Sequence, residues 1–396
     1  MGIIQFLKKQ YHVLQYDYRM LKQRWYSIKY KKLKVVKNKI LFDNFKGKEY
    51  GDSLKYIAEE IIRRGLNYDL VWTVRTLSED IPFPIRKVVV GTDQEAREYS
   101  SAKIIISNCK NAKPYIKKAN QYYIQTWHGS FALKFIEGEV EEKLSRGYIA
   151  ESKQDSRNTN VMLSSSSMIS SIMRKSFWYD GEIWECGLPR EDIYFHTTEK
   201  DKQNLKSKYN IDANSNILLY APTFRDNGDT SSYLMDLEIL LSILENETQK
   251  KWIGIVRLHP NVPQEKIPYK YSSLLLDGSK FPDSQELFLI SNVLITDYSS
   301  LMMDFGIMRK PVFLYIPDLE KYKKERGLRD IFNELPFPKA STIQQLQKII
   351  EQFNKNSYEQ SLDAFLQTKY VNYSDGHASE RVVDRIVNIV EGKFSY

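Results

Sequence analysis

Two series of short apolar runs, each alternating with helical stretches, predict an α/β protein of two Rossmann-like domains around a cleft. The chain has 396 residues, which is long enough for two domains of ordinary size. The apolar runs are continuous rather than alternating, which is typical of parallel strands covered by helices on both faces. Ligands of such sheets bind at the carboxyl ends of the strands, so we expect a ligand site in the cleft.

The first domain is assigned to residues 39–180. Its expected strands are 40–43, 70–74, 88–90, 104–107, 122–126 and 161–164. Its expected helices are 53–64, 92–100 and 166–176. Each helical stretch lies between two apolar runs, as the crossover connections of a parallel sheet require.

The second domain is assigned to residues 181–396. Its expected strands are 184–187, 217–221, 252–258, 273–277, 293–296 and 312–315. Helices are expected at 234–244 and 284–291. The tail from residue 343 is expected to form three helices, with 357–367 as the middle one.

A basic segment that contains an amphipathic helix is expected over residues 1–38. Apolar and aromatic side chains recur there at helical spacing: Leu7, Tyr11, Leu14, Tyr18, Leu21, Trp25 and Ile28. Of the 58 basic and 50 acidic residues, eleven and one respectively fall within residues 1–39, so the rest of the chain is nearly neutral. Aromatic side chains flanked by lysines favour contact with an anionic membrane surface. One alternative is that the helix packs on the rest of the protein or on a second copy in a homo-oligomer. Another is an arm that binds nucleic acid, but the nearly neutral charge of the remaining chain favours this least.

Two histidines directly follow expected strands, one in each half. His128 is followed by Gly129, and His259 is followed by Pro260, so a tight turn comes after each. These equivalent positions place both imidazoles at the cleft, where they can face a common substrate. A structural role for either histidine is the competing interpretation.

A second candidate site follows the expected strand 293–296. Ser299 and Ser300 lie there at the start of a helix, where hydroxyls and free backbone amides bind a phosphate or diphosphate. An ordinary helix N-cap is the alternative. Arg225, in the turn after strand 217–221, is either a phosphate ligand or a salt-bridge partner.

Several common chemistries are excluded by inspection. The chain has no P-loop motif, no H-E-x-x-H or C-x-x-C zinc motif and no G-x-S-x-G nucleophile elbow. It also has no G-x-G-x-x-G dinucleotide motif and no D-x-D pair. With only two cysteines, Cys109 and Cys186, neither a disulfide framework nor a cysteine-based metal site is expected. We therefore expect no metal and no cofactor.

Five separated motifs occur in an order that resembles a known family. They are the segments 125–129 (QTWHG), 187–192 (GLPRED), 221–226 (APTFRD), 257–260 (RLHP) and 296–300 (TDYSS), the last with Asp304. This arrangement is similar to that of the CDP-glycerol glycerophosphotransferases of wall teichoic acid and capsule synthesis, over about residues 35–390. The resemblance implies a GT-B-like fold and transfer of glycerol phosphate or ribitol phosphate from a CDP-polyol to an acceptor hydroxyl, with release of CMP.

The resemblance also implies roles for individual residues. His128 and His259 would be catalytic, one as the base and the other as the stabiliser of the diphosphate, with the assignment open in either direction. Substrate contacts would come from Trp127, Gly129, Ser130, Phe131, Arg190, Pro222, Thr223, Arg257, Leu258, Ser299, Ser300 and Asp304.

The same resemblance implies a polyprenyl-diphosphate-linked glycan as acceptor and a peripheral location at the cytoplasmic face of the plasma membrane. Two other functions compete with this one. The first is a GT-B glycosyltransferase or epimerase that uses a UDP-sugar, and the second is an inactive membrane-associated assembly protein. Neither accounts for the five motifs together with both histidines.

Overall fold

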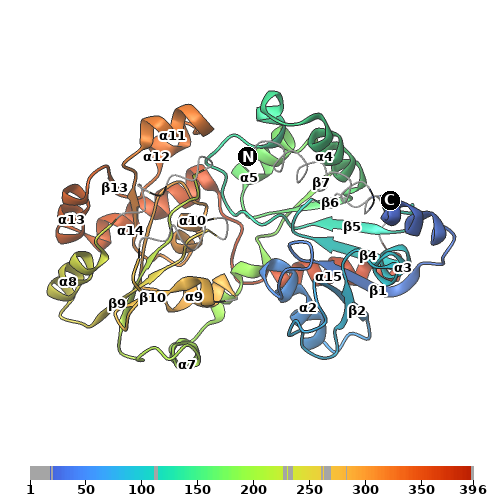
Figure 1. Ribbon diagram of the computed structural model, residues 1–396, viewed down its shortest axis with the longest axis horizontal. Coiled ribbons are helices and arrows are strands. Elements are labelled where there is room, and N and C mark those ends of the chain that lie inside the picture. The colour runs from blue at the N-terminus through green and yellow to red at the C-terminus, as the bar shows by residue number, and fades with distance from the viewer. Residues whose placement is uncertain are drawn as a thin grey trace, which may run out of the picture.

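The computed structural model consists of two α/β halves, each built on one parallel sheet (Figure 1). The structure describes residues 21–110, 115–225, 235–259, 269–281 and 283–393, together with residues 18, 230 and 262. Most residues of the inner strands are buried, as continuous apolar runs predict.

The first sheet has seven strands in the order β3-β2-β1-β4-β5-β6-β7. They are β1 (Val36–Asp43), β2 (Asp69–Val74), β3 (Arg86–Val89), β4 (Ala102–Ser107), β5 (Tyr122–Gln125), β6 (Val161–Ser164) and β7 (Glu182–Glu185). The helical segments between them are α2 (Asp52–Arg63), α3 (Asp93–Ser101), η1 (Glu137–Lys143), α4 (Arg146–Asn158) and α5 (Ser167–Ser176).

The second sheet has six strands in the order β10-β9-β8-β11-β12-β13. They are β8 (Asn216–Tyr220), β9 (Trp252–Val256), β10 (Leu275–Asp277), β11 (Val293–Thr296), β12 (Val312–Tyr315) and β13 (Lys339–Ala340). The helical segments between β7 and β13 are η2 (Pro189–Glu191), α6 (Ile193–His196), α7 (Glu199–Lys208), α8 (Leu237–Thr248), η5 (Gly278–Lys280), α9 (Ser284–Ile290), α10 (Leu301–Ile307), α11 (Leu319–Arg326) and α12 (Ile331–Glu334). The first of these, η2, packs on α2 of the first half.

The C-terminal tail forms the three helices expected from the sequence: α13 (Ile343–Glu351), α14 (Lys355–Phe365), which continues into η6 (Leu366–Tyr370), and α15 (Ala378–Glu391). The last of these returns to the first half and packs on α2 (Figure 1). Val382, Val383 and Ile386 of α15 are fully buried in the same core as Ile40 and Ile57. The first half is therefore completed by residues from the end of the chain.

One expected strand belongs to a different sheet from the one predicted. The strand expected at 184–187 is predicted to belong to the second domain. In the structure it is β7, which pairs in parallel with β6 at the edge of the first sheet. The apolar run of β7 is short. The sequence around it does not determine with which neighbouring strand it pairs. The chain therefore crosses to the second half only after residue 185.

The two halves are joined by ion pairs on both sides of the cleft. Lys55 of α2 contacts Asp283, with 2.6 Å between Nζ and Oδ2. Arg329 donates from Nη1 to Glu139 Oε1 at 2.8 Å and from Nε to the Ala132 carbonyl at 3.0 Å. The Lys55, Asp283, Glu139 and Arg329 side chains are mostly buried, so these pairs fix the halves relative to each other better than surface pairs would.

The described part of the N-terminal segment is helical over residues 21–29. One of its faces packs on the first half, where Gln23 and Ser27 are buried and Tyr30 donates to Asp93 at 2.7 Å. The stripe expected from the sequence lies on another face and is exposed, with 69, 67, 58 and 59% of Tyr18, Leu21, Trp25 and Ile28 accessible. The positions Leu7, Tyr11 and Leu14 lie outside the described residues. Within the described chain, no helix is long and apolar enough to cross a membrane.

Candidate functional site

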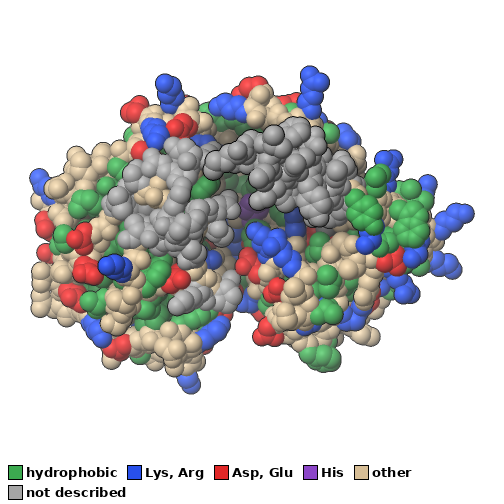
Figure 2. All heavy atoms as spheres, in the orientation of Figure 1, with side chains coloured by type: hydrophobic (Ala, Val, Ile, Leu, Met, Phe, Trp, Pro, Cys, Tyr) green, Lys and Arg blue, Asp and Glu red, His purple; other side chains and the backbone are tan. Residues whose placement is uncertain are grey.

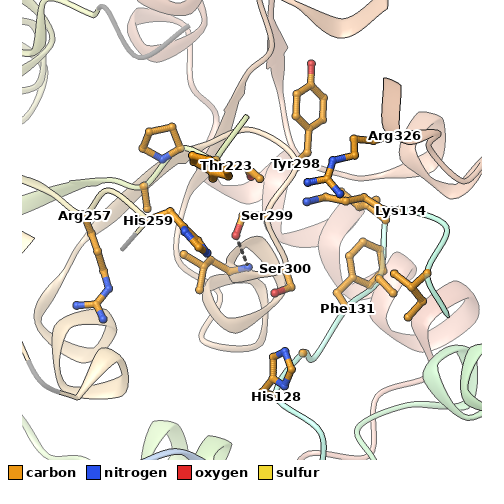
Figure 3. Close-up of a pocket in the computed structure, with 18 of the residues that line it drawn as sticks. His128, Phe131, Lys134, Thr223, Arg257, His259, Tyr298, Ser299, Ser300 and Arg326 are labelled. Carbon is orange, nitrogen blue, oxygen red and sulfur yellow. Dashed lines mark hydrogen bonds between the residues drawn. The ribbon is translucent and has the colours of Figure 1, made fainter. Parts of the chain in front are cut away.

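A cavity of about 550 Å³ lies between the carboxyl ends of strands from both sheets. Figure 3 shows His259 and Ser299 on one side of this space and His128 on the other. The sequence-predicted residues that line the cavity are Trp127, His128, Gly129, Phe131, Pro222, Thr223, Arg257, Leu258, His259, Ser299 and Ser300. The structure thus brings together residues from four of the five motifs.

Ser130, Arg190 and Asp304 do not line this cavity. Ser130 is fully buried and donates to Asp304 Oδ2 at 3.1 Å. Arg190 and Asp304 lie beside a second, smaller cavity of about 160 Å³. His128, Ser300 and Leu301 line both cavities, so the two spaces meet at the imidazole of His128 and the start of α10.

The turn after β5 presents His128 to both cavities. Trp127 has a left-handed backbone with φ of 55°, which is costly for a bulky residue, and its amide donates to the Gln125 side chain at 3.0 Å. His128 Nδ1 lies 2.7 Å from the carbonyl oxygen of Asn108. Because a carbonyl can only accept, Nδ1 carries the hydrogen and Nε2 holds the lone pair.

A network of polar side chains fixes this orientation of His128. Asn108 donates from Nδ2 to Asn44 at 2.7 Å and to Asp52 Oδ2 at 3.0 Å, and Arg190 Nη1 donates to the His128 carbonyl at 2.7 Å. Burial lowers the pKa of the His128 imidazole below its ordinary value of 6.5. The ring is therefore neutral near pH 7, with a basic nitrogen held in a fixed place.

His259 lies in surroundings that differ from those of His128. Its ring stacks on Phe224 with 5.6 Å between centroids, and the residue is exposed. Desolvation, followed by the positive charges of Lys134 and Lys48, lowers the pKa of this imidazole. A negatively charged ligand beside His259 would offset both effects, because it favours the protonated ring.

The turn that contains Thr223 is fixed by a buried carboxylate. The Thr223 amide and hydroxyl donate to Asp297 Oδ1 at 2.9 and 2.5 Å. Arg225 pairs with Asp297 at 2.9 Å and with Asp318 at 2.8 Å. The sequence left open whether Arg225 is a phosphate ligand or a salt-bridge partner, and the structure shows the salt bridges.

Arg257 lines the larger cavity but turns its guanidinium toward a loop (Figure 3). Nη1 donates to the carbonyls of Gly278 and Phe281 at 2.8 and 3.0 Å, and Nη2 donates to Ser284 Oγ at 3.0 Å. These contacts anchor the segment before α9 to the end of β9. The positive charge of Arg257 still contributes to the electrostatic potential of the larger cavity.

Two further cations at the larger cavity were not found from the sequence. Lys134 and Arg326 line it from the loop after His128 and from the end of α11 (Figure 3). Neither belongs to a motif, so only the tertiary structure reveals them. Among the described residues that line this cavity there is no aspartate or glutamate. The space is therefore suited to an anion such as a diphosphate.

The described residues contain no group of three or more His, Cys, Asp or Glu side chains that could hold a metal ion. The charge of an anionic ligand at this site would have to be met by the basic side chains and by hydrogen-bond donors. The start of α10 supplies such donors at Ser299 and Ser300.

Comparison with protein families gives one match over most of the chain. The family model described as CDP-Glycerol:Poly(glycerophosphate) glycerophosphotransferase matches residues 25–388. A teichoic acid poly(glycerol phosphate) polymerase of Staphylococcus epidermidis is 31% identical over 91% of this chain and 52% of its own length. A teichoic acid poly(ribitol-phosphate) polymerase of Bacillus spizizenii is 30% identical over 90% of this chain and 57% of its own. The chain spans about half the length of these curated relatives.

A relative of comparable length also matches. A teichoic acid glycerol-phosphate transferase of Staphylococcus aureus is 29% identical over 88% of this chain and 93% of its own length. Among solved structures, the wall teichoic acid polymerase TagF in an H444N variant with CDPG has a TM-score of 0.84, 28% identity and full coverage of both chains. The structure of S. aureus MnaA with UDP, at 12% identity and a TM-score of 0.52, shares the fold alone. These matches confirm the GT-B-like architecture expected from the sequence.

Proposed function

Because the chain belongs to the CDP-glycerol:poly(glycerophosphate) glycerophosphotransferase family, we propose that it transfers a polyol phosphate from a CDP-polyol to an acceptor hydroxyl and releases CMP. The observation that carries this proposal is the larger cavity, which combines several cations and helix-start hydroxyls with one fixed, neutral histidine. Such a site can bind a diphosphate and remove a proton from an attacking hydroxyl. Relatives named for glycerol phosphate and for ribitol phosphate both support a polyol donor.

In this reaction the acceptor hydroxyl attacks the phosphorus that carries the polyol. A new P–O bond forms, and the bond from this phosphorus to the bridging oxygen breaks, so that its electron pair leaves on CMP. The proton of the hydroxyl goes to Nε2 of His128, whose Nδ1–H is held by the Asn108 carbonyl. This role for His128 is supported by its lone pair and by its position where the two cavities meet.

The charge that develops on the transferred phosphoryl group and on CMP needs cationic and hydrogen-bond donors. We assign this task to His259, Lys134, Arg326 and the hydroxyls of Ser299 and Ser300, because they lie together at the larger cavity. Arg257 acts by anchoring the loop before α9. The second half would accordingly hold the CDP-polyol, and the first half would present the acceptor.

The reaction is tested by CMP release from CDP-glycerol and from CDP-ribitol, with and without a lipid-linked disaccharide acceptor. We expect acceptor-dependent CMP from one donor, lost in His128→Ala and retained in His377→Ala, a matched exposed histidine outside both cavities. Release of UDP from a UDP-sugar, with no CMP from either donor, would mean that the chain shares only the fold of its family. Product length on a gel would separate single addition from polymerisation.

We further propose peripheral attachment to the cytoplasmic face of the plasma membrane, where a polyprenyl-diphosphate-linked glycan would be the acceptor. Figure 2 shows hydrophobic side chains gathered with lysines and arginines at the edge formed by residues 21–29. Leu21 and Trp25 are exposed there, while the opposite face of the helix is packed on the protein. An exposed apolar stripe beside basic side chains suits an anionic lipid surface.

Binding to anionic vesicles tests this attachment. Leu21→Glu and Trp25→Glu should each weaken binding by about tenfold or more, because the glutamate removes apolar burial and repels the lipid headgroups. Leu77→Glu places the same charge on another exposed leucine and should have little effect. Activity on a soluble acceptor should stay unchanged in all three. Unaltered vesicle binding in the helix variants would instead indicate a role in self-association, which sedimentation would detect.

A further inference from the structure

The smaller cavity differs in charge from the larger one. Four carboxylates line it, those of Glu49, Asp52, Asp283 and Asp304. Its volume of about 160 Å³, at about 30 Å³ per water, leaves room for a group of several heavy atoms. Arg190 is its only lysine or arginine among the described residues. A phosphate would meet mainly negative charge here, whereas hydroxyl groups could donate to the carboxylates.

Three of the four carboxylates are used within the protein. Asp52 accepts from Asn108, Asp283 pairs with Lys55, and Asp304 accepts from Tyr194 at 2.9 Å and from Ser130. The Glu49 carboxylate accepts no hydrogen bond from any described residue, and burial raises its pKa. It is therefore a half-buried acceptor with hydrogen-bonding capacity left for a ligand.

Arg190 is a second residue of the smaller cavity with unused hydrogen-bonding capacity. Its side chain is 7% exposed and lines the smaller cavity, and its Nε is buried without a hydrogen-bond partner in the described chain. An orphaned buried donor is costly and is usually satisfied by water or a ligand. The cavity thus offers one unused acceptor and one unused donor, which matches a group that both donates and accepts hydrogen bonds. A hydroxyl does both.

From these contacts we propose that the smaller cavity is the subsite for the uncharged, hydroxyl-bearing end of the acceptor, a polyol or sugar unit without a terminal phosphate. This inference rests on the proposed transfer reaction. A polyol seated against Glu49 and Arg190 lies in one of two spaces that meet at His128, and the diphosphate lies in the other. The shared imidazole can then take the proton from the hydroxyl that attacks. An acceptor capped by a phosphomonoester is excluded by charge.

Gly51 allows the cavity to be filled without strain in the backbone. It lines the cavity, its φ of −175° is extended, and a Cβ added to it would meet no atom within 4 Å. Gly51→Leu should therefore occupy the space while the protein stays folded. Gly147→Leu, on the exposed face of α4, is the matched control, because a Cβ there is equally free of contacts. Glu49→Gln tests the carboxylate without changing its size.

Two measurements on the full chain test the subsite. In steady-state CMP release with glycerophosphoglycerol as acceptor, Gly51→Leu should raise the acceptor KM at least tenfold and Glu49→Gln several-fold. The Kd for CDP-glycerol, measured by calorimetry, should stay within twofold, and Gly147→Leu should match wild type. The phosphomonoester-capped form of the same acceptor should not be used. Unchanged acceptor KM in both cavity variants would overturn the proposal, and so would weaker donor binding with unchanged acceptor KM, which would assign the space to the donor's own glycerol.

A binding measurement that needs no turnover separates this inference from the proposed function. Saturation-transfer NMR should detect glycerophosphoglycerol on wild type and on Gly147→Leu, and lose it on Gly51→Leu. If wild type releases no CMP but this pattern holds, the transfer reaction is wrong and the subsite stands as a polyol site. If CMP is released and the signal is equal in all three proteins, the reaction stands and the subsite is refuted.

Discussion

The two histidines of the cleft follow strands at equivalent places in the two sheets, yet their surroundings differ. His128 is held at its ring by the Asn108 carbonyl and at its backbone by Arg190, and it borders both cavities. His259 is exposed, rests on the ring of Phe224 and borders only the larger cavity. A fixed lone pair suits a base, whereas an exposed ring among cations suits contact with an anion. Equivalent positions along the chain thus acquire different roles from their neighbours.

The largest expected effect comes from removing the fixed histidine. His128→Ala should lower kcat by about 10²–10⁴, the usual contribution of general base catalysis, because the acceptor proton then has no positioned acceptor. The Kd for the CDP-polyol should change by less than about threefold, since His128 contributes little charge when neutral. Stopped-flow turnover and calorimetry measure the two quantities. A parallel loss of turnover and donor affinity would instead place His128 among the donor contacts.

The next effect is on stability and comes from Asp52, whose carboxylate contacts Asn108 and Arg190 beside this histidine. Asp52→Ala removes a partner of Asn108 and of Arg190, and losing one member of a buried pair costs about 3–5 kcal/mol. Asp384→Ala removes an exposed partner of Arg64 and should cost at most about 1 kcal/mol. Urea denaturation compares the two variants. If Asp52→Ala is no more costly than Asp384→Ala, the network does not hold His128 in place.

The sequence was sufficient to place most of the strands, although not β13, and to place both histidines after strands. Buried parallel strands are continuous apolar runs, and a side chain directly after such a strand must lie at the ligand-binding edge of the sheet. The seryl pair after β11 was expected at this edge for the same reason, and it lines the larger cavity. These inferences needed only local pattern and the geometry of a parallel sheet.

The features that the sequence did not predict depend on contacts between segments that are distant along the chain. The edge strand β7 and the helix α15 both belong to the first half, which only tertiary pairing decides. Lys134 and Arg326 carry no local signal because they lie outside any motif. The sequence indicated that Arg190 and Arg257 have the right chemistry for phosphate, but not that Arg190 is buried beside the smaller cavity and Arg257 bound to a loop.

His259 offers the third test of the comparison. His259→Ala should raise the Kd for the CDP-polyol by about tenfold, the equivalent of a hydrogen bond to a charged group, with a smaller loss of kcat than His128→Ala. His259→Gln should restore part of the affinity, because an amide can still donate a hydrogen bond. Calorimetry with the CDP-polyol measures both variants. A larger loss of turnover than in His128→Ala would exchange the roles of the two residues.

The smallest expected effect is the pH dependence of the reaction. Burial lowers the pKa of His128 below 6.5, so the neutral, basic form already predominates at pH 7. The value of kcat/KM should therefore rise through a midpoint below pH 6.5 and be constant above it, and this acid limb should vanish in His128→Ala. The unfolded chain binds the proton more readily than the folded one. The stability linked to His128 is therefore present above about pH 6.5 and lost as the pH falls through the lowered pKa. A rising limb with its midpoint above 6.5 would mean that a group other than His128 loses the proton that controls the reaction.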